Sequence, residues 1–510
     1  MIMNSAVKFL ETAFERYPER PSMEDERGSM SFRELRRKSM SAASRLLGKQ
    51  TQDISPVLVY LPKSTDCVVS FMAALYSGNP YVPVDCDIPA NRLEKIIESL
   101  CPGYIITNDN LAENLPDEIG DAEVLIFNDE LVGASIDETL IYAAVDSVID
   151  TDPIYIMYTS GSTGMPKGVT VSHRGVIDYA MWLCHTFKFD ENTVMANQAA
   201  FYFDNSVFDI YGCLCCCGKM VIIPQNLILF PSKLPLYLAE KEITSIFWVP
   251  TVMISVANSG ALSGCSLPKL RTVAFCGEVM PNLQLNIWRR ELPDCVYANL
   301  YGPTEITDVC SYYIADRVFD DAEPLPIGRA CENTRIVMLT DDGRIAEPME
   351  HGELCVAGSG VALGYWNAPE ISDKVFVQNP ANKRYSERIY KTGDLAYVNE
   401  EGMIIFLGRR DSQIKLRGNR IELGDIETAA VCIDGVESAC AMFDSEKQEI
   451  VLFIETKEEF ILRKFNMLLK KYVPSYMLPG RLISMEKLPH TSNDKINRVT
   501  LHRTYILEDA

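Results

Sequence analysis

Residues 158–169 carry the densest set of chemically useful groups in the chain, reading Tyr-Thr-Ser-Gly-Ser-Thr-Gly-Met-Pro-Lys-Gly-Val. Hydroxyl side chains alternate with glycines and precede a lysine; the candidate phosphate contacts are Thr159, Ser160, Gly161, Ser162, Thr163, Gly164 and Lys167. Glycine lets a backbone approach an anion closely, and successive N–H groups form an anion-binding concavity. The Walker spacing is absent. We therefore predict a polyphosphate-binding loop; the alternative, a flexible surface turn, is disfavoured by the apolar strand-like run before it.

Two further motifs carry groups suited to a nucleotide. Residues 299–305 read Asn-Leu-Tyr-Gly-Pro-Thr-Glu, so that Tyr301 precedes a tight turn and can stack on a purine. Glu305 offers a hard oxygen ligand of the kind that Mg²⁺ prefers. Asp394 follows a glycine turn in residues 390–395, where its carboxylate can accept hydrogen bonds from ribose hydroxyls. Read singly, each motif is equally compatible with an ordinary structural turn.

Two charged segments lie nearer the C-terminus. Residues 408–418 are dense in charge and fall where the sequence pattern changes, which is the place for a hinge between domains. Residues 489–498 put Lys495 on a polar turn, from which a small mobile domain could deliver it into a distant site. The alternative for residues 408–418 is a solvated linker, and the alternative for residues 489–498 is an ordinary surface turn.

Composition narrows the class of protein. A chain of 510 residues is too long for one ordinary domain, and 47% hydrophobic with 23% charged residues is typical of a soluble globular protein. The net charge of −22 argues against a general nucleic-acid binder. We find no uninterrupted apolar run of about 18 residues, and no signal peptide, so we expect neither membrane insertion nor secretion.

The 16 cysteines are scattered, which indicates reduced thiols and a cytoplasmic location. Four of them cluster at 213–217 and invite interpretation as a metal site. That segment is apolar and helix-like, with no histidine nearby, and a free cysteine behaves as a small buried hydrophobe. We therefore expect core packing there instead of a metal.

The elements that must position these motifs alternate between strand-like and helix-like segments over residues 1–310. Expected strands are 56–60, 81–84, 104–107, 123–127 and 244–249, and expected helices are 67–77 and 92–99. This alternation predicts α/β layers with largely parallel sheets. Residues 320–407 instead hold short β-prone runs separated by turn signals, which predicts an antiparallel β subdomain. Beyond residue 409 a strand at 450–455 and an amphipathic helix at 459–471 predict a mixed domain.

The five motifs, in this order and spacing, resemble the adenylate-forming (AMP-binding) superfamily of acyl-CoA synthetases, luciferases and amino-acid adenylation domains of nonribosomal peptide synthesis. Residues 203–206, Phe-Asp-Asn-Ser, resemble the amino-acid branch, in which the aspartate grips the substrate's ammonium group. The resemblance implies two doubly wound sheets and a β-barrel-like part (320–409) within an N-terminal core of residues 1–409. It also implies a small mobile α+β lid of residues 410–510, with its hinge at Asp411.

The resemblance also implies a two-step reaction in which ATP and Mg²⁺ convert an amino acid to its adenylate, which then passes to a thiol. Catalytic roles fall to Lys495, Glu305, Thr304 and Asp411, of which Lys495 bridges carboxylate and phosphate and Glu305 binds the metal. ATP contacts fall to residues 159–164 and to Lys167, Gly277, Asn299, Tyr301, Gly302, Asp394 and Arg409. The family usually has Gly before and Asp two residues after the lysine, where this chain has Asp494 and Asn497.

By the same resemblance, the amino acid would contact Asp204, Asn205, Phe208, Phe247, Ala274, Cys276, Leu300, Asp308, Val309 and Lys495. The stretch around Cys276 is similar to D-alanine–carrier protein ligases, whereas Leu300 and Asp308 depart from them. An unpaired buried carboxylate is costly, so Asp308 suggests a polar or basic substrate side chain or a water. We expect a small-to-medium amino acid, with D-alanine as the alternative.

The chain ends soon after Lys495 with no carrier domain, so we expect a separate carrier protein as acceptor, with free coenzyme A as the alternative. Two rival classes are an acyl- or aryl-CoA synthetase, which Asp204 disfavours, and a non-catalytic nucleotide-binding module, which Glu305 and Lys495 disfavour.

Overall fold

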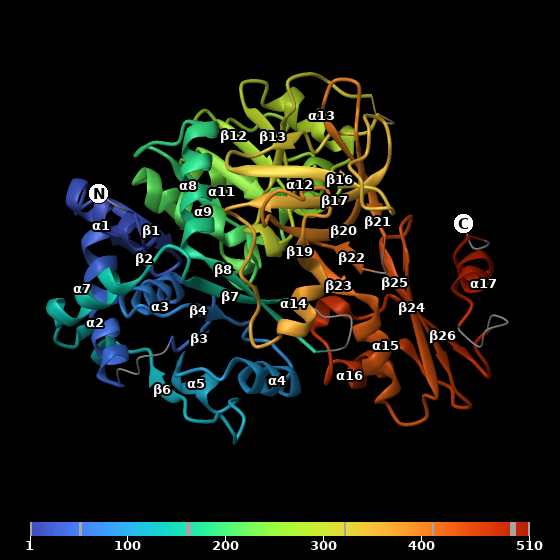
Figure 1. Cartoon of the computed structure of the whole chain (residues 1–510), viewed down its shortest axis with the longest axis horizontal. Helices are drawn as coiled ribbons and strands as arrows, with labels where there is room; N and C mark the ends of the chain where they lie inside the picture. Colours follow the sequence, from blue (N-terminus) through green and yellow to red (C-terminus); the bar gives the residue numbers. More distant parts are fainter. Residues whose placement is uncertain are drawn as a thin grey trace.

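The computed structural model describes residues 3–49, 54–159, 165–320, 323–410, 413–489 and 496–507. Two large sheets, one antiparallel sheet and a C-terminal pair of small sheets succeed one another along the chain, and Figure 1 shows the C-terminal pair packed at one side.

The first large sheet has nine strands in the order β15-β14-β13-β12-β11-β9-β10-β1-β2. Its central pairs, from β13 through β12, β11, β9 and β10 to β1, are parallel, and antiparallel strands close both edges. The bounds are β1 Pro21–Asp25, β2 Gly28–Ser31, β9 Val194–Asn197, β10 Lys219–Ile222, β11 Ser245–Trp248, β12 Thr272–Phe275, β13 Val296–Tyr301, β14 Ser311–Ile314 and β15 Arg329–Ala330.

The second large sheet has seven strands in the order β18-β8-β7-β4-β3-β5-β6, parallel from β7 to β6. Its strands are β3 Val57–Tyr60, β4 Tyr81–Pro83, β5 Tyr104–Thr107, β6 Glu123–Ile126, β7 Pro153–Thr159, β8 Lys167–Ser172 and β18 Gly364–Tyr365. Strands β7 and β8 pair antiparallel up to Thr159 and Lys167, which flank residues 160–164 of the predicted phosphate loop.

Helices fill the space between the two large sheets and cover their outer faces. Alternation along β11 explains the layering, because Phe247 faces the inner core whereas Ile246 and Trp248 face the outer one. The inner layer contains α1 Lys8–Arg16, α2 Phe32–Leu46, η1 Leu47–Lys49, α3 Thr65–Tyr76, α6 Asp129–Gly133, α7 Glu138–Ser147, α8 His173–Phe187 and α9 Asn205–Cys216. The nine-stranded sheet is covered outside by α10 Gln225–Ile228, η2 Pro231–Lys233, α11 Leu234–Glu240, α12 Pro250–Asn258 and α13 Asn282–Glu291. The seven-stranded sheet is covered outside by α4 Ala90–Leu100, with α5 Asp109–Ala112 nearby.

The antiparallel sheet follows, in the order β16-β17-β20-β19, with β21 also paired to β20. Its elements are β16 Thr334–Leu339, β17 Gly352–Gly358, α14 Pro369–Val375, β19 Phe376–Gln378, β20 Arg388–Val398 and β21 Ile404–Arg409. The short helix η3 Thr304–Ile306 lies ahead of it, after β13.

From residue 413 on, the chain builds a two-stranded hairpin and a three-stranded sheet with hydrophobic clusters of their own. The elements are β22 Gln413–Leu416, β23 Asn419–Glu422, α15 Leu423–Val431, β24 Ser438–Asp444, β25 Glu449–Glu455, α16 Leu462–Leu469, η4 Ser475–Met477, β26 Arg481–Met485, α17 Arg498–His502 and η5 Arg503–Leu507.

The predicted fold class is confirmed: α/β layers, an antiparallel sheet and a mixed C-terminal part. Two details of the predictions are wrong. The helix expected at 459–471 is only Leu462–Leu469, and within 320–409 the short strands β15 and β18 pair with the two large sheets instead of the antiparallel one. The domain limits stay a prediction, and Asp411 lies outside the described residues.

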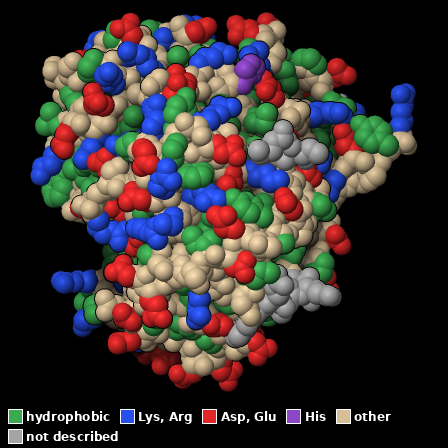
Figure 2. Space-filling model, turned by 90° about the vertical axis from the view of Figure 1, so that its left-hand side faces the viewer, with side chains coloured by type: hydrophobic (Ala, Val, Ile, Leu, Met, Phe, Trp, Pro, Cys, Tyr) green, Lys and Arg blue, Asp and Glu red, His purple; other side chains and the backbone are tan. Residues whose placement is uncertain are grey.

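Acidic and basic side chains are interspersed over the face shown in Figure 2, with acidic ones gathered along its lower edge. Among the described residues, no helix is both long and apolar enough to cross a bilayer. In the same part of the chain, no group of three or more His, Cys, Asp or Glu side chains could hold a metal ion.

Candidate active site

One cavity opens where β7, β12 and β13 end and α9 begins, and the β22–β23 hairpin closes it. The polar or charged residues that line it are Thr159, Asp204, Asn205, Thr304, Asp394, Arg409, Gln413, Lys415 and Arg420. Carboxyl ends of parallel strands meet at one sheet edge, which is where α/β proteins bind ligands. The fold therefore gathers four of the five sequence motifs, 158–169, 299–305, 390–395 and 408–418, into one place.

The residues predicted to contact the nucleoside, Tyr301, Asp394 and Arg409, are joined by hydrogen bonds. Arg409 Nη1 donates to Asp394 Oδ1 at 2.7 Å, and the Tyr301 hydroxyl donates to the other carboxylate oxygen, Oδ2. The Asp394 backbone N–H also donates to Thr392 Oγ1, which shapes the turn. Tyr301 and Asp394 are both buried; Asp394 and Arg409 line the cavity, whereas Tyr301 lies behind its wall.

Glu305 is fully buried beside the cavity yet fully provided with partners. Arg420 Nη1 donates to its Oε2 at 2.7 Å, and the Tyr365 hydroxyl donates to Oε1 at 2.8 Å. Burial raises the pKa of the Glu305 carboxyl, but the Arg420 guanidinium and the Tyr365 hydroxyl outweigh burial and hold the pKa below its usual value. Glu305 is thus an ionised carboxylate that faces a cation.

The donor set fits a nucleotide-bound Mg²⁺. The buried, ionised Glu305 carboxylate is a hard oxygen ligand of the kind that this ion takes together with substrate phosphates, and the adjacent residue, Thr304, lines the cavity, whereas Glu305 lies behind its wall.

Asp204 lies at the N-terminus of α9 and lines the cavity. It is the N-cap residue of α9, and its Oδ1 accepts the Asn205 backbone N–H at 3.0 Å. Burial raises the pKa of the Asp204 carboxyl, a shift that a hydrogen bond from Thr304 and the Lys415 ammonium partly oppose. A half-buried carboxylate at a helix start is suited to bind a cation that enters the cavity.

Most of the predicted side-chain pocket lies behind the cavity wall. Asn205 and Cys276 line the cavity with Asp204, whereas the other predicted wall residues are buried without lining it: Phe208, Phe247, Ala274, Leu300, Asp308 and Val309. The rings of Phe208 and Phe247 stack with centroids 4.3 Å apart. Two stacked phenyl rings fill the space that a long substrate side chain would need.

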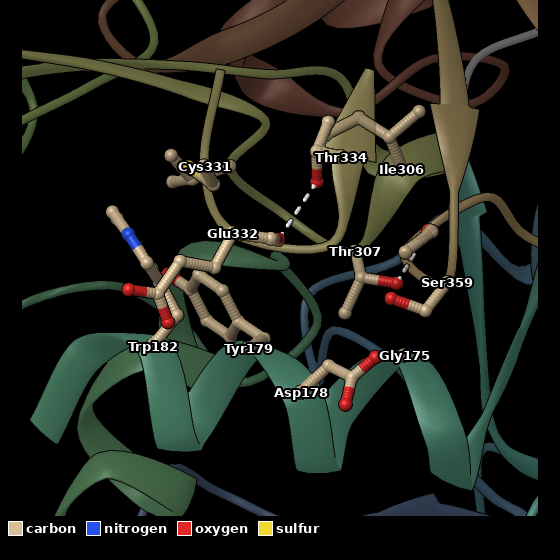
Figure 3. A pocket seen from close by; sticks show the side chains of 12 residues that line it. Gly175, Asp178, Tyr179, Trp182, Ile306, Thr307, Cys331, Glu332, Thr334 and Ser359 are labelled. Atoms are coloured by element: carbon tan, nitrogen blue, oxygen red, sulfur yellow. Dashed lines mark hydrogen bonds between the residues drawn. The ribbon is translucent and has the colours of Figure 1, made fainter. Parts of the chain in front are cut away.

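Asp308 has a partner that the sequence did not predict. The Tyr179 hydroxyl of α8 donates to Asp308 Oδ2 at 2.6 Å, so neither a substrate side chain nor a water is needed to explain the buried acid. Burial and the nearby Asp204 charge raise the pKa of the Asp308 carboxyl well above its usual value. Figure 3 shows Tyr179 on the face of α8 turned toward Thr307 and Glu332, where these residues line a second, small cavity.

A groove reaches the same region from another side. It is lined by Lys63, Gln198, Phe203, Asn205, Leu229, Val249 and Arg417, among others. The Lys63 ammonium donates to the carbonyls of Asn197 and Gln198 at 3.2 and 3.0 Å. Within the described residues, the buried Gln198 Oε1 and Asn205 Nδ2 have no hydrogen-bond partner. The groove thus offers one acceptor and one donor to a ligand near the start of α9.

The remaining predicted residues are placed as follows. Gly277 and Gly302 line the cavity. Asn299 donates its amide to the Pro326 carbonyl at 2.8 Å and does not line the cavity, and the Lys167 ammonium lies 5.5 Å from the Tyr365 ring centroid. Ser160, Gly161, Ser162, Thr163, Gly164 and Lys495 lie outside the described residues.

Sequence reasoning missed Lys63, Tyr179, Tyr365, Lys415 and Arg420. Lys415 was within reach because it belongs to the charged segment 408–418, and Arg420 lies two residues beyond that segment. The clustered cysteines pack as expected, with Cys213 and Cys217 buried in the core.

Comparison with known proteins assigns the family. The family of AMP-binding enzymes matches residues 10–366, so the chain belongs to the AMP-binding enzymes, which use ATP. Among its relatives, D-alanine–D-alanyl carrier protein ligase of Bacillus mycoides is 31% identical over 92% of this chain and 94% of that protein. Tyrocidine synthase 1 of Brevibacillus parabrevis is 30% identical over 97% of this chain. The chain spans 44% of the length of that synthase.

Solved structures agree on the fold. An adenylation domain of Vibrio cholerae, AlmE, in complex with glycyl-adenosine-5′-phosphate matches 99% of this chain and 98% of its own with a TM-score of 0.82 at 22% identity. A nonribosomal peptide synthetase protein with adenylation and PCP domains matches 98% of this chain and 84% of its own, also at 0.82, with 23% identity. The predicted superfamily and the predicted ligase class of enzyme are confirmed.

Proposed function

We propose that this protein activates a small amino acid with Mg·ATP as its aminoacyl-adenylate and then transfers the aminoacyl group to the phosphopantetheine thiol of a separate carrier protein. The observation that carries this proposal is the position of Asp204. Its half-buried carboxylate lines the same cavity as Thr304, Asp394 and Arg409, so a substrate ammonium and a nucleotide can be held within one cavity.

In the first half-reaction, the substrate carboxylate attacks the α-phosphate and pyrophosphate leaves. The chain's residues bind and orient the reactants: Asp204 holds the ammonium, Asp394 and Arg409 hold the ribose, and Thr304 contacts phosphate. Glu305 would hold a Mg²⁺, whose charge would neutralise the phosphate oxygens. Lys495 adds a cation between carboxylate and phosphate, a preorganised contribution typically worth roughly 10²–10³ in rate.

In the second half-reaction, the thiol attacks the adenylate carbonyl, the new C–S bond forms and AMP leaves. The groove lined by Lys63, Gln198 and Asn205 is the proposed path for the thiol arm. Phosphopantetheine carries amide groups, and the buried Gln198 Oε1 and Asn205 Nδ2 offer an acceptor and a donor to them. Burying such groups without a partner is unfavourable, which supports an occupied groove during turnover.

The substrate is small. Of the predicted wall residues, Asp204, Asn205 and Cys276 line the cavity, and the Phe208–Phe247 stack stands behind them. Asp308 is engaged by Tyr179, so the earlier inference of a polar or basic side chain loses its basis. We propose glycine, L-alanine or D-alanine as the substrate. D-Alanine is the amino acid in the name of the carrier protein ligases that are among the relatives.

Amino-acid-dependent ATP–pyrophosphate exchange over a panel of L- and D-amino acids, fatty acids and aryl acids tests this proposal. We expect exchange with glycine or an alanine enantiomer and little with larger side chains. Exchange driven by fatty or aryl acids would instead identify an acyl-CoA synthetase, and exchange with none of the acids would favour a non-catalytic module. Because all 16 cysteines are free, we also propose a cytoplasmic location.

A further inference from the structure

Three cysteine thiols meet between α8 and α9, which lie side by side (Figure 1). Cys184 belongs to α8, and Cys215 and Cys216 form the last residues of α9. Cys184 Sγ lies 3.8 Å from the Gly212 carbonyl oxygen of α9. A helical carbonyl points toward the N–H four residues on, so the Cys184 thiol lies over the turn of α9 that carries Cys215 and Cys216.

A glycine lets the two helices approach closely at this point. A Cβ on Gly212 would lie 3.7 Å from Leu183 Cδ1 of α8 and 3.1 Å from the terminal methyl group of Met195. A larger side chain at this position would therefore press against α8 and against β9. A disulfide needs Cα atoms about 4.4–6.8 Å apart, so a close approach of the helices is a precondition for joining their cysteines.

The contacts within the trio distinguish one cysteine of α9 as the nucleophile. The Cys184 thiol is hydrogen-bonded to the thiols of Cys215 and Cys216. The hydrogen bond from Cys184 lowers the pKa of the Cys215 thiol, although burial opposes this shift. The same contacts raise the pKa of the Cys184 thiol. Because a thiolate is the form that attacks a disulfide, Cys215 is suited to attack first and Cys184 to act as its resolving partner.

Access from solvent separates this trio from its neighbours in sequence. Cys184, Cys215 and Cys216 are half-buried, whereas Cys213 and Cys217 are buried. Burial raises the pKa of the Cys213 thiol well above its usual value and that of the Cys217 thiol to about 11. Redox-active cysteines combine thiolate character, solvent access and a neighbouring thiol. The trio has all three properties, and the two buried neighbours lack the first two.

We propose that Cys184 and Cys215 form a redox-modification site that reacts with a low-molecular-weight disulfide such as oxidised glutathione. The Cys215 thiolate attacks one sulfur of that disulfide, so that a mixed disulfide forms and one thiolate leaves. The Cys184 sulfur then attacks Cys215 Sγ, and the second thiolate leaves with the proton that Cys184 gives up. Two protein thiols are thereby oxidised to one disulfide while the small disulfide is reduced to two thiols. The new bond joins α8 to α9 behind the active-site cavity.

The first test uses the wild-type chain, treated with oxidised glutathione in excess over reduced glutathione, quenched in acid, alkylated and digested without reduction. Trypsin leaves Cys184 in the peptide 175–188 and Cys215 in the peptide 189–219. We expect to recover these two peptides joined, and separate after reduction. The exposed Cys432, the control, should take up glutathione as a mixed disulfide. Recovery of the peptide 175–188 only in alkylated or glutathionylated form would overturn the proposal.

Serine variants identify the cysteine of α9 that takes part. The rate at which the peptide 175–188 becomes cross-linked should fall at least tenfold in Cys215→Ser, because the nucleophile is gone. Cys216→Ser, the matched control on the adjacent residue, should stay within about threefold of wild type. Thermal unfolding of the reduced proteins verifies that both variants are folded. Equal cross-linking rates in the two variants would overturn the assignment to Cys215. Neither test requires an amino acid or ATP, so both are independent of the proposed function.

Discussion

At the scale of single residues, the site contains two acids that differ in burial and in partners, the half-buried Asp204 and the buried Asp308. Asp204 lines the cavity and caps α9, whereas Asp308 lies behind the wall and accepts the Tyr179 hydroxyl. The same residue type therefore plays two roles, because one carboxylate faces space that a ligand can enter and the other faces a protein donor. Each role leads to a different expected effect of the same change, Asp to Asn.

Asp204→Asn should raise KM for the amino acid by about 10- to 100-fold, since a hydrogen bond to a charged group is worth about 1.5–3 kcal/mol. Asparagine is also a good N-cap, so α9 should keep its stability and KM for ATP should not change. Pyrophosphate exchange at varied amino-acid concentration measures both constants. An unchanged KM for the amino acid would contradict ammonium binding at Asp204.

The pH dependence of amino-acid use should report the same carboxylate. Burial raises the Asp204 pKa, so falling pH should protonate this group at a higher pH than an ordinary aspartate, near 3.9. Since only the carboxylate attracts the ammonium, kcat/KM for the amino acid should decline on the acid side in wild type. This decline at low pH should be absent in Asp204→Asn. If kcat/KM fell equally in both proteins, the titrating group would be one other than Asp204.

Asp308→Asn should leave activity within about threefold of wild type and the order of preferred amino acids unchanged. The Tyr179 hydroxyl donates to Asp308 Oδ2, and an amide oxygen can accept the same hydrogen bond, so asparagine is a close substitute there. Exchange over the amino-acid panel is the measurement. Loss of activity, or a new preference for neutral over basic side chains, would show that Asp308 contacts the substrate.

At the scale of elements, the β22–β23 hairpin decides which residues face the reactants. It brings Gln413, Lys415, Gly418 and Arg420 into the cavity wall. Its turn depends on glycine, because Gly418 has φ +77° and meets Val249 at close range. The hairpin is thus an element whose docking geometry one methyl group can disturb.

Gly418→Ala should slow thiol transfer at least tenfold and leave adenylation nearly intact, because its Cβ would collide with Val249 only when the hairpin is docked. Gly402→Ala is the matched control, since Gly402 has φ +76° with no atom within 4 Å of an added Cβ. A left-handed backbone costs an alanine about 1 kcal/mol at either position. Equal transfer rates in the two variants would contradict a role for hairpin docking.

At the scale of the whole molecule, the proposed reaction requires groups from the core and from the C-terminal part of the chain. The described structure brings the C-terminal hairpin to the cavity, while the predicted catalytic lysine, Lys495, lies outside the described residues. The two half-reactions therefore offer a way to separate contributions of different C-terminal segments.

Lys495→Ala should reduce adenylation by roughly 10²–10³, the usual effect of removing one preorganised electrostatic group. Transfer from chemically supplied adenylate to the thiol should be far less affected, because that step has no pentavalent phosphate charge to offset. Lys487→Ala, an exposed lysine shortly before it, is the control. Comparable losses in the two half-reactions would assign Lys495 a structural role.

The sequence by itself determined the family, the α/β class and the motifs of the nucleotide site, because these depend on local patterns of glycine, hydroxyl and charged residues. Tertiary structure alone decided which groups meet. Arg420 and Glu305 are 115 residues apart in sequence, and Tyr179 and Asp308 are 129 apart. No spacing rule links such pairs, since they meet only after separate sheets and helices have packed. Whether a wall residue lines a cavity or lies behind it, as with Phe208, is likewise set by packing, because the same apolar side chain satisfies either environment.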